Sequence, residues 1–93
     1  AMPDYRRFFV AGGTYFFTVV TYRRRRLFEH RKPRQILGAT IRECRAMWPF
    51  AVDALVLLPD HLHAIWSLPS GDSNYPARWS FIKKTFTQNY LAD

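Results

Sequence analysis

Residues 51–68, AVDALVLLPDHLHAIWSL, decide the fold of this chain. They contain two mostly apolar runs, 51–58 and 61–68, which are separated only by Pro59 and Asp60. Both residues are typical of tight turns, because Pro presets the backbone angle φ and the Asp side chain accepts local hydrogen bonds. The stretch therefore predicts two β-strands joined by a tight connection.

A further strand is predicted at residues 14–21, TYFFTVVT, which are apolar at both alternating positions. Such a strand is expected to lie in the middle of its sheet and to be covered on both faces. Helices are predicted at residues 33–48 and 76–90, where apolar side chains recur at helical spacing. Their apolar stripes comprise Ile36, Leu37, Ile41, Cys44, Met47 and Trp48 in the first helix, and Trp79, Ile82, Phe86 and Tyr90 in the second.

The order strand, helix, strand, strand, helix indicates an α+β fold of the ferredoxin-like, split βαβ type, in a single domain spanning residues 1–93. A ferredoxin-like sandwich continues with one more strand, so we expect a truncated domain in which one sheet edge is unpaired. Unpaired edges are prone to pair with another chain. We therefore expect a homodimer, formed by edge pairing or by strand exchange.

Composition and charge narrow the class of function. With 48% hydrophobic and 17% aromatic residues among 93, the chain has enough apolar surface to fold, which excludes intrinsic disorder. Fourteen Lys and Arg against seven Asp and Glu give a net charge of +7, which favours a nucleic-acid partner. No apolar run reaches the roughly 18 residues of a membrane-spanning helix, and the single Cys44 cannot form an internal disulfide. These features predict a cytoplasmic protein.

The sequence His61-Leu62-His63 begins a predicted strand and suggests a metal site. Residues i and i+2 of a strand point to the same face, about 7 Å apart, so the two imidazoles can converge on one divalent cation. Two histidines leave the coordination incomplete, so a third protein ligand or water is needed. His-x-His also occurs by chance, and the spacing alone leaves metal binding and a structural role equally open.

The run LLPDHLHAIW at residues 57–66 resembles the HUH motif of single-tyrosine transposases, and most closely the motif of the REP-associated tyrosine transposases. Further stretches agree in order and position, so that the resemblance spans nearly the whole chain. These stretches are Tyr5-Arg6-Arg7, the run GGTYFFTV at residues 12–19, and Arg78-Trp79 with the run IKKTFT at residues 82–87.

The resemblance implies a bacterial DNA strand-cleaving and rejoining enzyme with a ferredoxin-like core. In that family a histidine pair holds Mg²⁺ or Mn²⁺, which polarises a phosphate of single-stranded DNA. A tyrosine then attacks phosphorus and forms a 5′-phosphotyrosine, and this branch acts on hairpin repeats. By position, His61 and His63 would be the metal ligands.

The chain departs from the family pattern at the nucleophile, which the family carries on a helix beyond the fourth strand. Only thirty residues follow His63 here, so neither that tyrosine helix nor the third metal ligand is expected. Tyr90 is predicted on a helix and is the remaining candidate, but its register with Ile82 and Phe86 is also that of a core residue. We therefore expect this chain not to cleave DNA.

Basic residues are the candidates for contacts with DNA phosphates, and aromatic residues near the N-terminus, including Tyr5, could stack on unpaired bases. A run of charged residues can also be a solvated surface with no binding role. For the run at residues 23–26, binding is favoured because the sequence contains no acidic cluster of matching size to neutralise it. The candidate DNA-binding residues are Arg6, Arg7, Arg23, Arg24, Arg25, Arg26, Lys83 and Lys84.

Two acidic residues lie near the predicted metal site in sequence. Asp60 belongs to the turn, where it either makes local hydrogen bonds or orients the imidazole of His61. Asp53 has the opposite parity to the histidines if Leu58 pairs with His61, so it is not expected to be a ligand. Two other functions remain open: a non-catalytic module that binds single-stranded nucleic acid, and a small metal-dependent hydrolase.

Overall fold

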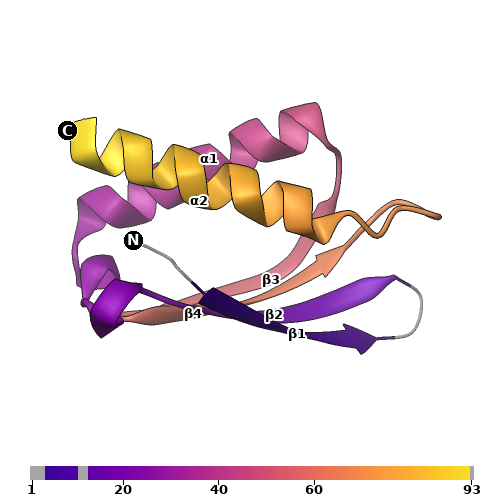
Figure 1. Cartoon of the computed structure of the whole chain (residues 1–93), viewed down its shortest axis with the longest axis horizontal. Coiled ribbons are helices and arrows are strands. Elements are labelled where there is room, and N and C mark those ends of the chain that lie inside the picture. The colour runs from indigo at the N-terminus through magenta and orange to yellow at the C-terminus, as the bar shows by residue number, and fades with distance from the viewer. Residues whose placement is uncertain (1–3, 11–12, 93) are drawn as a thin grey trace.

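Four antiparallel strands form a sheet, and two helices pack on one of its faces (Figure 1). This computed structural model describes residues 4–10 and 13–92, with side chains for residues 13–92. The strands are β1 (Asp4–Val10), β2 (Thr14–Val20), β3 (Ala51–Leu58) and β4 (His61–Ser67). The helices are α1 (Arg31–Met47) and α2 (Tyr75–Ala92), with short 3-10 turns η1 (Tyr22–Arg24) and η2 (Leu27–Glu29) after β2.

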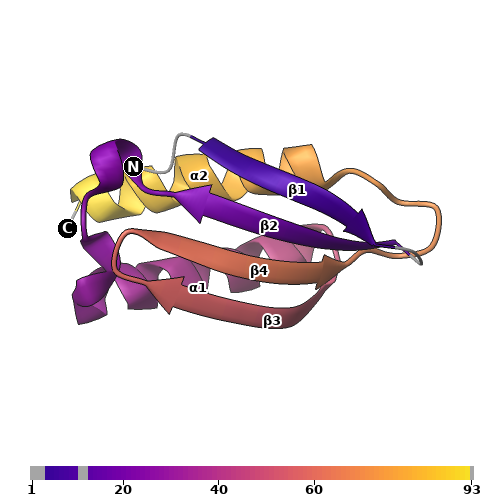
Figure 2. The same ribbon diagram turned by 90° about the horizontal axis from the view of Figure 1, so that it is seen from below.

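The strand order β1-β2-β4-β3 places β4 between β2 and β3 (Figure 2). Since β2 and β3 both run antiparallel to β4, they are parallel to each other, and α1 connects them. This is the split βαβ arrangement. The predicted α+β class is confirmed, and the strands expected at residues 14–21, 51–58 and 61–68 agree with the structure to within one residue.

Strand β1 was not predicted. Its register with β2 runs from Asp4 opposite Val20 to Val10 opposite Thr14. The mixture of charged and aromatic residues in this segment obscures a strand pattern, yet charged residues are common on strands that form a sheet edge. Because β1 pairs along β2, the edge of β2 is not open. The stated reason for a homodimer is therefore lost, while the homodimer itself stays a prediction.

The core lies between the sheet and the helices. Burial alternates along β2 and β4, so that Phe17, Leu62 and Trp66 face the helices and are fully buried. The rings of Trp66 and Trp79 stack with centroids 4.4 Å apart, and Phe17 packs edge-on against Trp66 at 4.9 Å. Strand β2 is central as predicted, but only one of its faces is covered by helices (Figure 1).

The helical stripes are buried in the middle and exposed at their C-terminal ends. Leu37, Ile41 and Cys44 are buried, as are Trp79, Ile82 and Phe86. Met47 and Trp48 are 48% and 41% exposed, and Tyr90 is 36% exposed, so these three were wrongly predicted as core. Neither described helix is long and apolar enough to cross a membrane.

A buried arginine on α2 joins the ends of both helices. The guanidinium of Arg78 donates two hydrogen bonds to the carboxylate of Asp72, at 3.2 and 2.9 Å. It also donates to the carbonyls of Trp48, Pro49 and Asn74 at 3.0–3.4 Å. Its side chain is only 3% exposed, so the charge depends on these partners. The pKa of Asp72 lies below its ordinary value, first because of the Arg78 hydrogen bond.

Candidate metal centre and nucleic-acid interface

The helices leave one face of the sheet uncovered, which we call the open face (Figure 2). The two histidines of the His-x-His sequence lie on this face, because they alternate along β4 with the buried Leu62 and Ala64. His61 and His63 are half-buried and alternate with Leu62, which is in the core. Their ring centroids are 5.0 Å apart and the rings are nearly perpendicular, at 82°. The predicted convergence of the two side chains on one face is therefore present.

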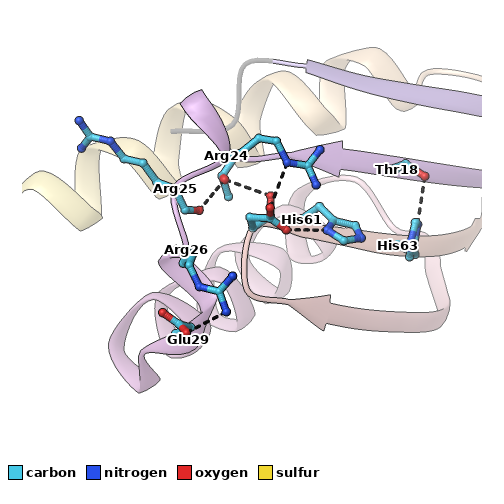
Figure 3. Close-up of polar contacts among 9 residues, drawn as sticks. Thr18, Arg24, Arg25, Arg26, Glu29, His61 and His63 are labelled. Atoms are coloured by element: carbon cyan, nitrogen blue, oxygen red, sulfur yellow. Dashed lines mark hydrogen bonds and ion pairs between the residues drawn. The ribbon is translucent and has the colours of Figure 1, made fainter.

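Each imidazole is oriented by a hydrogen bond at Nδ1. His61 Nδ1 donates to Asp60 Oδ1 at 2.8 Å, and His63 Nδ1 lies 3.0 Å from Thr18 Oγ1 (Figure 3). An ionised carboxylate can only accept, so neutral His61 carries its proton on Nδ1 and has its lone pair on Nε2. A ring oriented in this way is typical of metal-binding histidines.

Asp60 connects the histidine to the basic segment. Arg24 Nε donates to Asp60 Oδ2 at 3.0 Å, and both the backbone N–H and the hydroxyl of Thr21 lie 3.0 Å from the Asp60 carbonyl oxygen (Figure 3). The hydrogen bond from His61, together with that from Arg24, lowers the pKa of Asp60 below its ordinary value. The carboxylate is thus ionised at neutral pH, and the reading in which Asp60 orients His61 is the one the geometry supports.

The two Nε2 atoms are the donor atoms that remain for a cation. Within residues 13–92, neither atom has a hydrogen-bond partner. Imidazole nitrogen suits several divalent metals, so the pair fits two positions of a coordination shell. Among the described residues, no group of three or more His, Cys, Asp or Glu side chains could hold a metal ion by itself. Remaining ligands would have to come from water, a phosphate or another part of the protein.

Thr18 was missed by the sequence reasoning. It lies on β2 directly opposite His63 in the register of β2 and β4. Directly opposed residues of an antiparallel pair share a face and lie close enough to interact. Both strands were predicted from the sequence, but the residue spacing within each strand does not reveal the register between them. The sequence alone therefore could not place Thr18 opposite His63.

Two of the four arginines at residues 23–26 have single acidic partners, which the sequence did not indicate, although no acidic cluster matches the whole run. Arg24 pairs with Asp60, and Arg26 pairs with Glu29 at 3.0 Å. These two side chains remain 63% and 61% exposed, so the ion pairs are weak and do not prevent contact with a phosphate. Arg23 lies over the ring of Tyr22 at 5.1 Å.

Of the other predicted DNA-binding residues, Lys83 and Lys84 do not share a surface with the histidines. Lys83 and Lys84 lie on α2, in the helical layer across the sheet from the open face (Figure 1). Arg6 and Arg7 lie on β1, opposite Thr18 and Phe17 in the register, and their side chains fall outside the described residues. Arg24, Arg25 and Arg26 lie at the end of the sheet where β4 begins with His61 (Figure 3), and the backbone of Arg6 lies in register with Thr18 and, through it, with His63.

The described tyrosine side chains do not project from the open face. Tyr15 is buried and packs against Tyr75 at a centroid distance of 5.2 Å, on the covered side. Tyr22 and Tyr90 line a pocket between η1 and the end of α2. Tyr90 belongs to the layer opposite the histidines, and the side chain of Tyr5 lies outside the described residues.

Asp53 lies on the open face, although a regular β3 strand would have turned its side chain to the other face. Leu58 does pair with His61, as the argument assumed, but a β-bulge interrupts β3 between Val52 and Ala54. The bulge brings Asp53 to the open face, where it accepts a hydrogen bond from Ser67. Ser67 is the last residue of β4, so Asp53 lies at the end of the strand opposite to the histidines.

No protein-family profile matches the chain. Among curated proteins, it is 44% identical over 86 residues to the REP-associated tyrosine transposase of Escherichia coli (strain K12), covering 92% of this chain and 52% of that protein. It is 37% identical over 87 residues to a Haemophilus influenzae protein whose name as a REP-associated tyrosine transposase is provisional, covering 94% and 49%. The chain thus spans about half the length of the curated relatives it matches.

A solved structure gives the same result for the fold. The structure of a REP-associated tyrosine transposase bound to a REP hairpin superposes with a TM-score of 0.75 at 43% sequence identity. The match covers 95% of this chain and 53% of that one. Over the half of these relatives that it spans, the chain resembles the REP-associated tyrosine transposases in both sequence and fold.

Proposed function

We propose that the chain provides hairpin-DNA binding and two metal ligands for a transposase of the HUH type, which cuts and rejoins single-stranded DNA. The observation that carries the proposal is the histidine pair on the open face. Both Nδ1 atoms have partners there, and both Nε2 atoms remain available. The solved relative bound to a REP hairpin supports a hairpin as the partner. Since bacterial DNA lies in the cytoplasm, we expect the protein to act there.

His61 and His63 would hold a divalent metal, Mg²⁺ or Mn²⁺, through Nε2. Such a metal, when bound, supplies Lewis-acid polarisation of a phosphate oxygen. The contribution of this chain is to fix the two imidazoles before the metal arrives. Asp60 fixes His61, and Thr18 fixes His63.

Contacts with DNA phosphates are assigned to the basic residues on the sheet and its adjoining turns. Residues 23–26 adjoin the histidine pair through the Arg24–Asp60 ion pair, so a strand bound there would pass next to the metal ligands. Arg6 and Arg7 are assigned to the same role by the family resemblance. Lys83 and Lys84, in the helical layer, would meet a more distant part of the DNA.

The tyrosine nucleophile is proposed to lie outside the described side chains. Tyr15 and Tyr75 face the core, and Tyr22 and Tyr90 line the pocket at the end of α2, so none of the four is placed to attack a phosphate held by His61 and His63. The chain incubated with a hairpin oligonucleotide and Mn²⁺ should therefore form no covalent DNA adduct. An adduct seen by denaturing electrophoresis would contradict this part of the proposal.

A second candidate function is a non-catalytic module that binds single-stranded nucleic acid. The absence of a complete metal-ligand cluster among residues 13–92 favours it. The two functions differ in metal dependence, because only the first predicts that Mn²⁺ strengthens hairpin binding and that His61→Ala removes the effect. Self-association through a sheet edge is a separate proposal, and a strictly monomeric species at high concentration in gel filtration would contradict it.

Hairpin binding is tested by fluorescence anisotropy over a range of salt concentrations. Wild type should bind a hairpin with a salt dependence that reflects several phosphate contacts, and the double substitution R6Q/R7Q should reduce the log–log slope by about 2. The matched control is R31Q/R42Q, which removes the same charge from exposed positions of α1.

The control should leave the slope nearly unchanged, because α1 lies behind the sheet from the open face (Figure 2). Equal slopes for the two double variants would show that only net charge matters and would remove Arg6 and Arg7 from the interface. Failure of wild type to bind any hairpin would overturn the proposed function.

A further inference from the structure

A pocket of about 190 Å³ lies between the segment after β2 and the C-terminal end of α2. It is separate from the histidine pair but close to it in the chain, because Thr21, which binds the Asp60 carbonyl, directly precedes Tyr22. Its volume is below the roughly 300 Å³ at which pockets for drug-sized molecules begin, so it suits a single ring. It is lined by Tyr22, Arg25, Leu27, Thr87, Tyr90 and Leu91.

Two partly exposed tyrosine rings supply its aromatic surface. Tyr90 stacks on the buried Phe86 with centroids 5.8 Å apart and an angle of 6° between the planes. This contact fixes the orientation of the Tyr90 ring while 36% of the residue remains exposed. Tyr22 is 44% exposed. Preorganised aromatic rings of this kind are the usual platforms for unpaired bases.

Arg25 supplies a cation at the same pocket. Its side chain extends away from the histidines, toward the end of α2 (Figure 3). Its backbone is fixed, since its carbonyl accepts a hydrogen bond from the Thr21 hydroxyl at 2.6 Å. Unlike Arg24 and Arg26, it has no carboxylate partner within the described part of the chain. A guanidinium in this setting is suited to a phosphate.

We propose that this Tyr22–Tyr90 pocket binds one unpaired nucleotide of single-stranded DNA. The base stacks on the tyrosine rings, and Arg25 pairs with a phosphate of the same strand. An apolar peptide side chain would use the rings but not the cation, so the combination favours a nucleotide. The inference rests on the proposed function, because it assigns a subsite for the strand that runs next to the histidines.

The test uses a DNA hairpin with short single-stranded overhangs, in which each overhang nucleotide is replaced in turn by an abasic residue. For wild type, one abasic position should weaken binding by roughly 10-fold in fluorescence anisotropy, because the stacked base is lost. In the double variant Y22L/Y90L, the same abasic position should have no further effect. Y22F/Y90F should behave as wild type, since both rings are retained.

Two controls keep the result specific. Trp48→Leu removes an aromatic side chain of similar exposure (41%) outside the pocket and should retain the abasic effect. Arg25→Gln, at an exposed position, should weaken binding of the overhang-bearing hairpin but not of a blunt hairpin, which keeps the test valid if Y22L/Y90L does not fold. An abasic effect of equal size in wild type and Y22L/Y90L would contradict nucleotide binding in this pocket. Equal weakening of both hairpins by Arg25→Gln would contradict it as well, and neither result would affect the proposal of hairpin binding. No binding of any hairpin by wild type would overturn both proposals.

Discussion

The two faces of the sheet are built from the same strands but are held in different ways. On the covered face, Phe17, Leu62 and Trp66 are fully buried in the core. Phe17 and Trp66 both contact Trp79 of α2. On the open face, His61 and His63 are half-buried and are oriented by hydrogen bonds. The comparison shows that packing on one face fixes the strands, while hydrogen bonds on the other fix the side chains available for chemistry.

The two faces are coupled by the strand period of two. With Leu62 and Ala64 in the core, His61 and His63 must point to the open face. A slip of one residue in β4 would place both imidazoles in the core without partners, which is costly. The apolar core thus specifies the register on which the histidine site depends.

The largest effect should come from the covered face. Trp66→Ala removes a ring in contact with Phe17, Phe50 and Trp79, and should lower the free energy of unfolding by about 3–5 kcal/mol. The neighbouring Ile65→Ala, half-buried on the open face, should cost well under half as much. Urea denaturation followed by circular dichroism measures both. Equal losses would contradict the division of the sheet into a packed face and an open one.

A somewhat smaller effect should follow from Arg78→Met in the helical layer. It leaves the helix-end carbonyls and Asp72 without their donor, and should destabilise the fold by about 3 kcal/mol. The exposed Arg42→Met on α1 is the matched control and should change stability by less than about 0.5 kcal/mol.

The same variant gives a pH test. Because Arg78 lowers the pKa of Asp72 in the folded state, the stabilisation is fully present above the ordinary pKa of 3.8 and is lost as the pH falls through the lower folded-state value. The difference in stability between wild type and Arg78→Met should therefore shrink below pH 3.8. A constant difference down to the lowest pH at which both fold would show that the ion pair contributes nothing to it.

The smallest effects concern the hydrogen bonds of the open face. Asp60→Ala should weaken Mn²⁺ binding roughly 10-fold, because His61 loses the acceptor that orients it. Asp60→Asn keeps an acceptor oxygen and should recover part of the affinity. Thr18→Val should have a smaller effect than Asp60→Ala, because a neutral hydroxyl binds an imidazole less strongly than a carboxylate does. Isothermal titration calorimetry with MnCl₂ measures the affinity of each variant. If Asp60→Asn bound Mn²⁺ no more tightly than Asp60→Ala, the negative charge of Asp60, and not its hydrogen bond to His61, would account for its contribution.

The sequence predicted most of the strands and the orientation of the histidine pair, because both follow from local periodicity. The turn at Pro59 and Asp60 and the alternation around Leu62 need no knowledge of the rest of the chain. Orientation of His61 by Asp60 was one of the two roles predicted for Asp60, because the two residues are adjacent in the sequence.

Other features depend on pairing between distant segments and could not be predicted locally. The Thr18–His63 contact requires the register of β2 and β4, which are 45 residues apart at that point. The ion pair of Arg24 with Asp60 depends on a turn with left-handed backbone angles at Arg23 and Arg24. The position of Asp53 depends on a bulge, which reverses a parity that a regular strand would keep.

The most direct test of the histidine site is paramagnetic broadening of imidazole NMR signals by substoichiometric Mn²⁺. The chain has three histidines, and the exposed His30, before α1, is an internal control for non-specific contact. We predict that the His61 and His63 signals broaden together at a Mn²⁺ concentration that leaves His30 sharp, and that His63→Ala removes the broadening of His61. Equal broadening of all three signals, or none at His61 and His63, would contradict the assignment of the open face as a metal-binding surface.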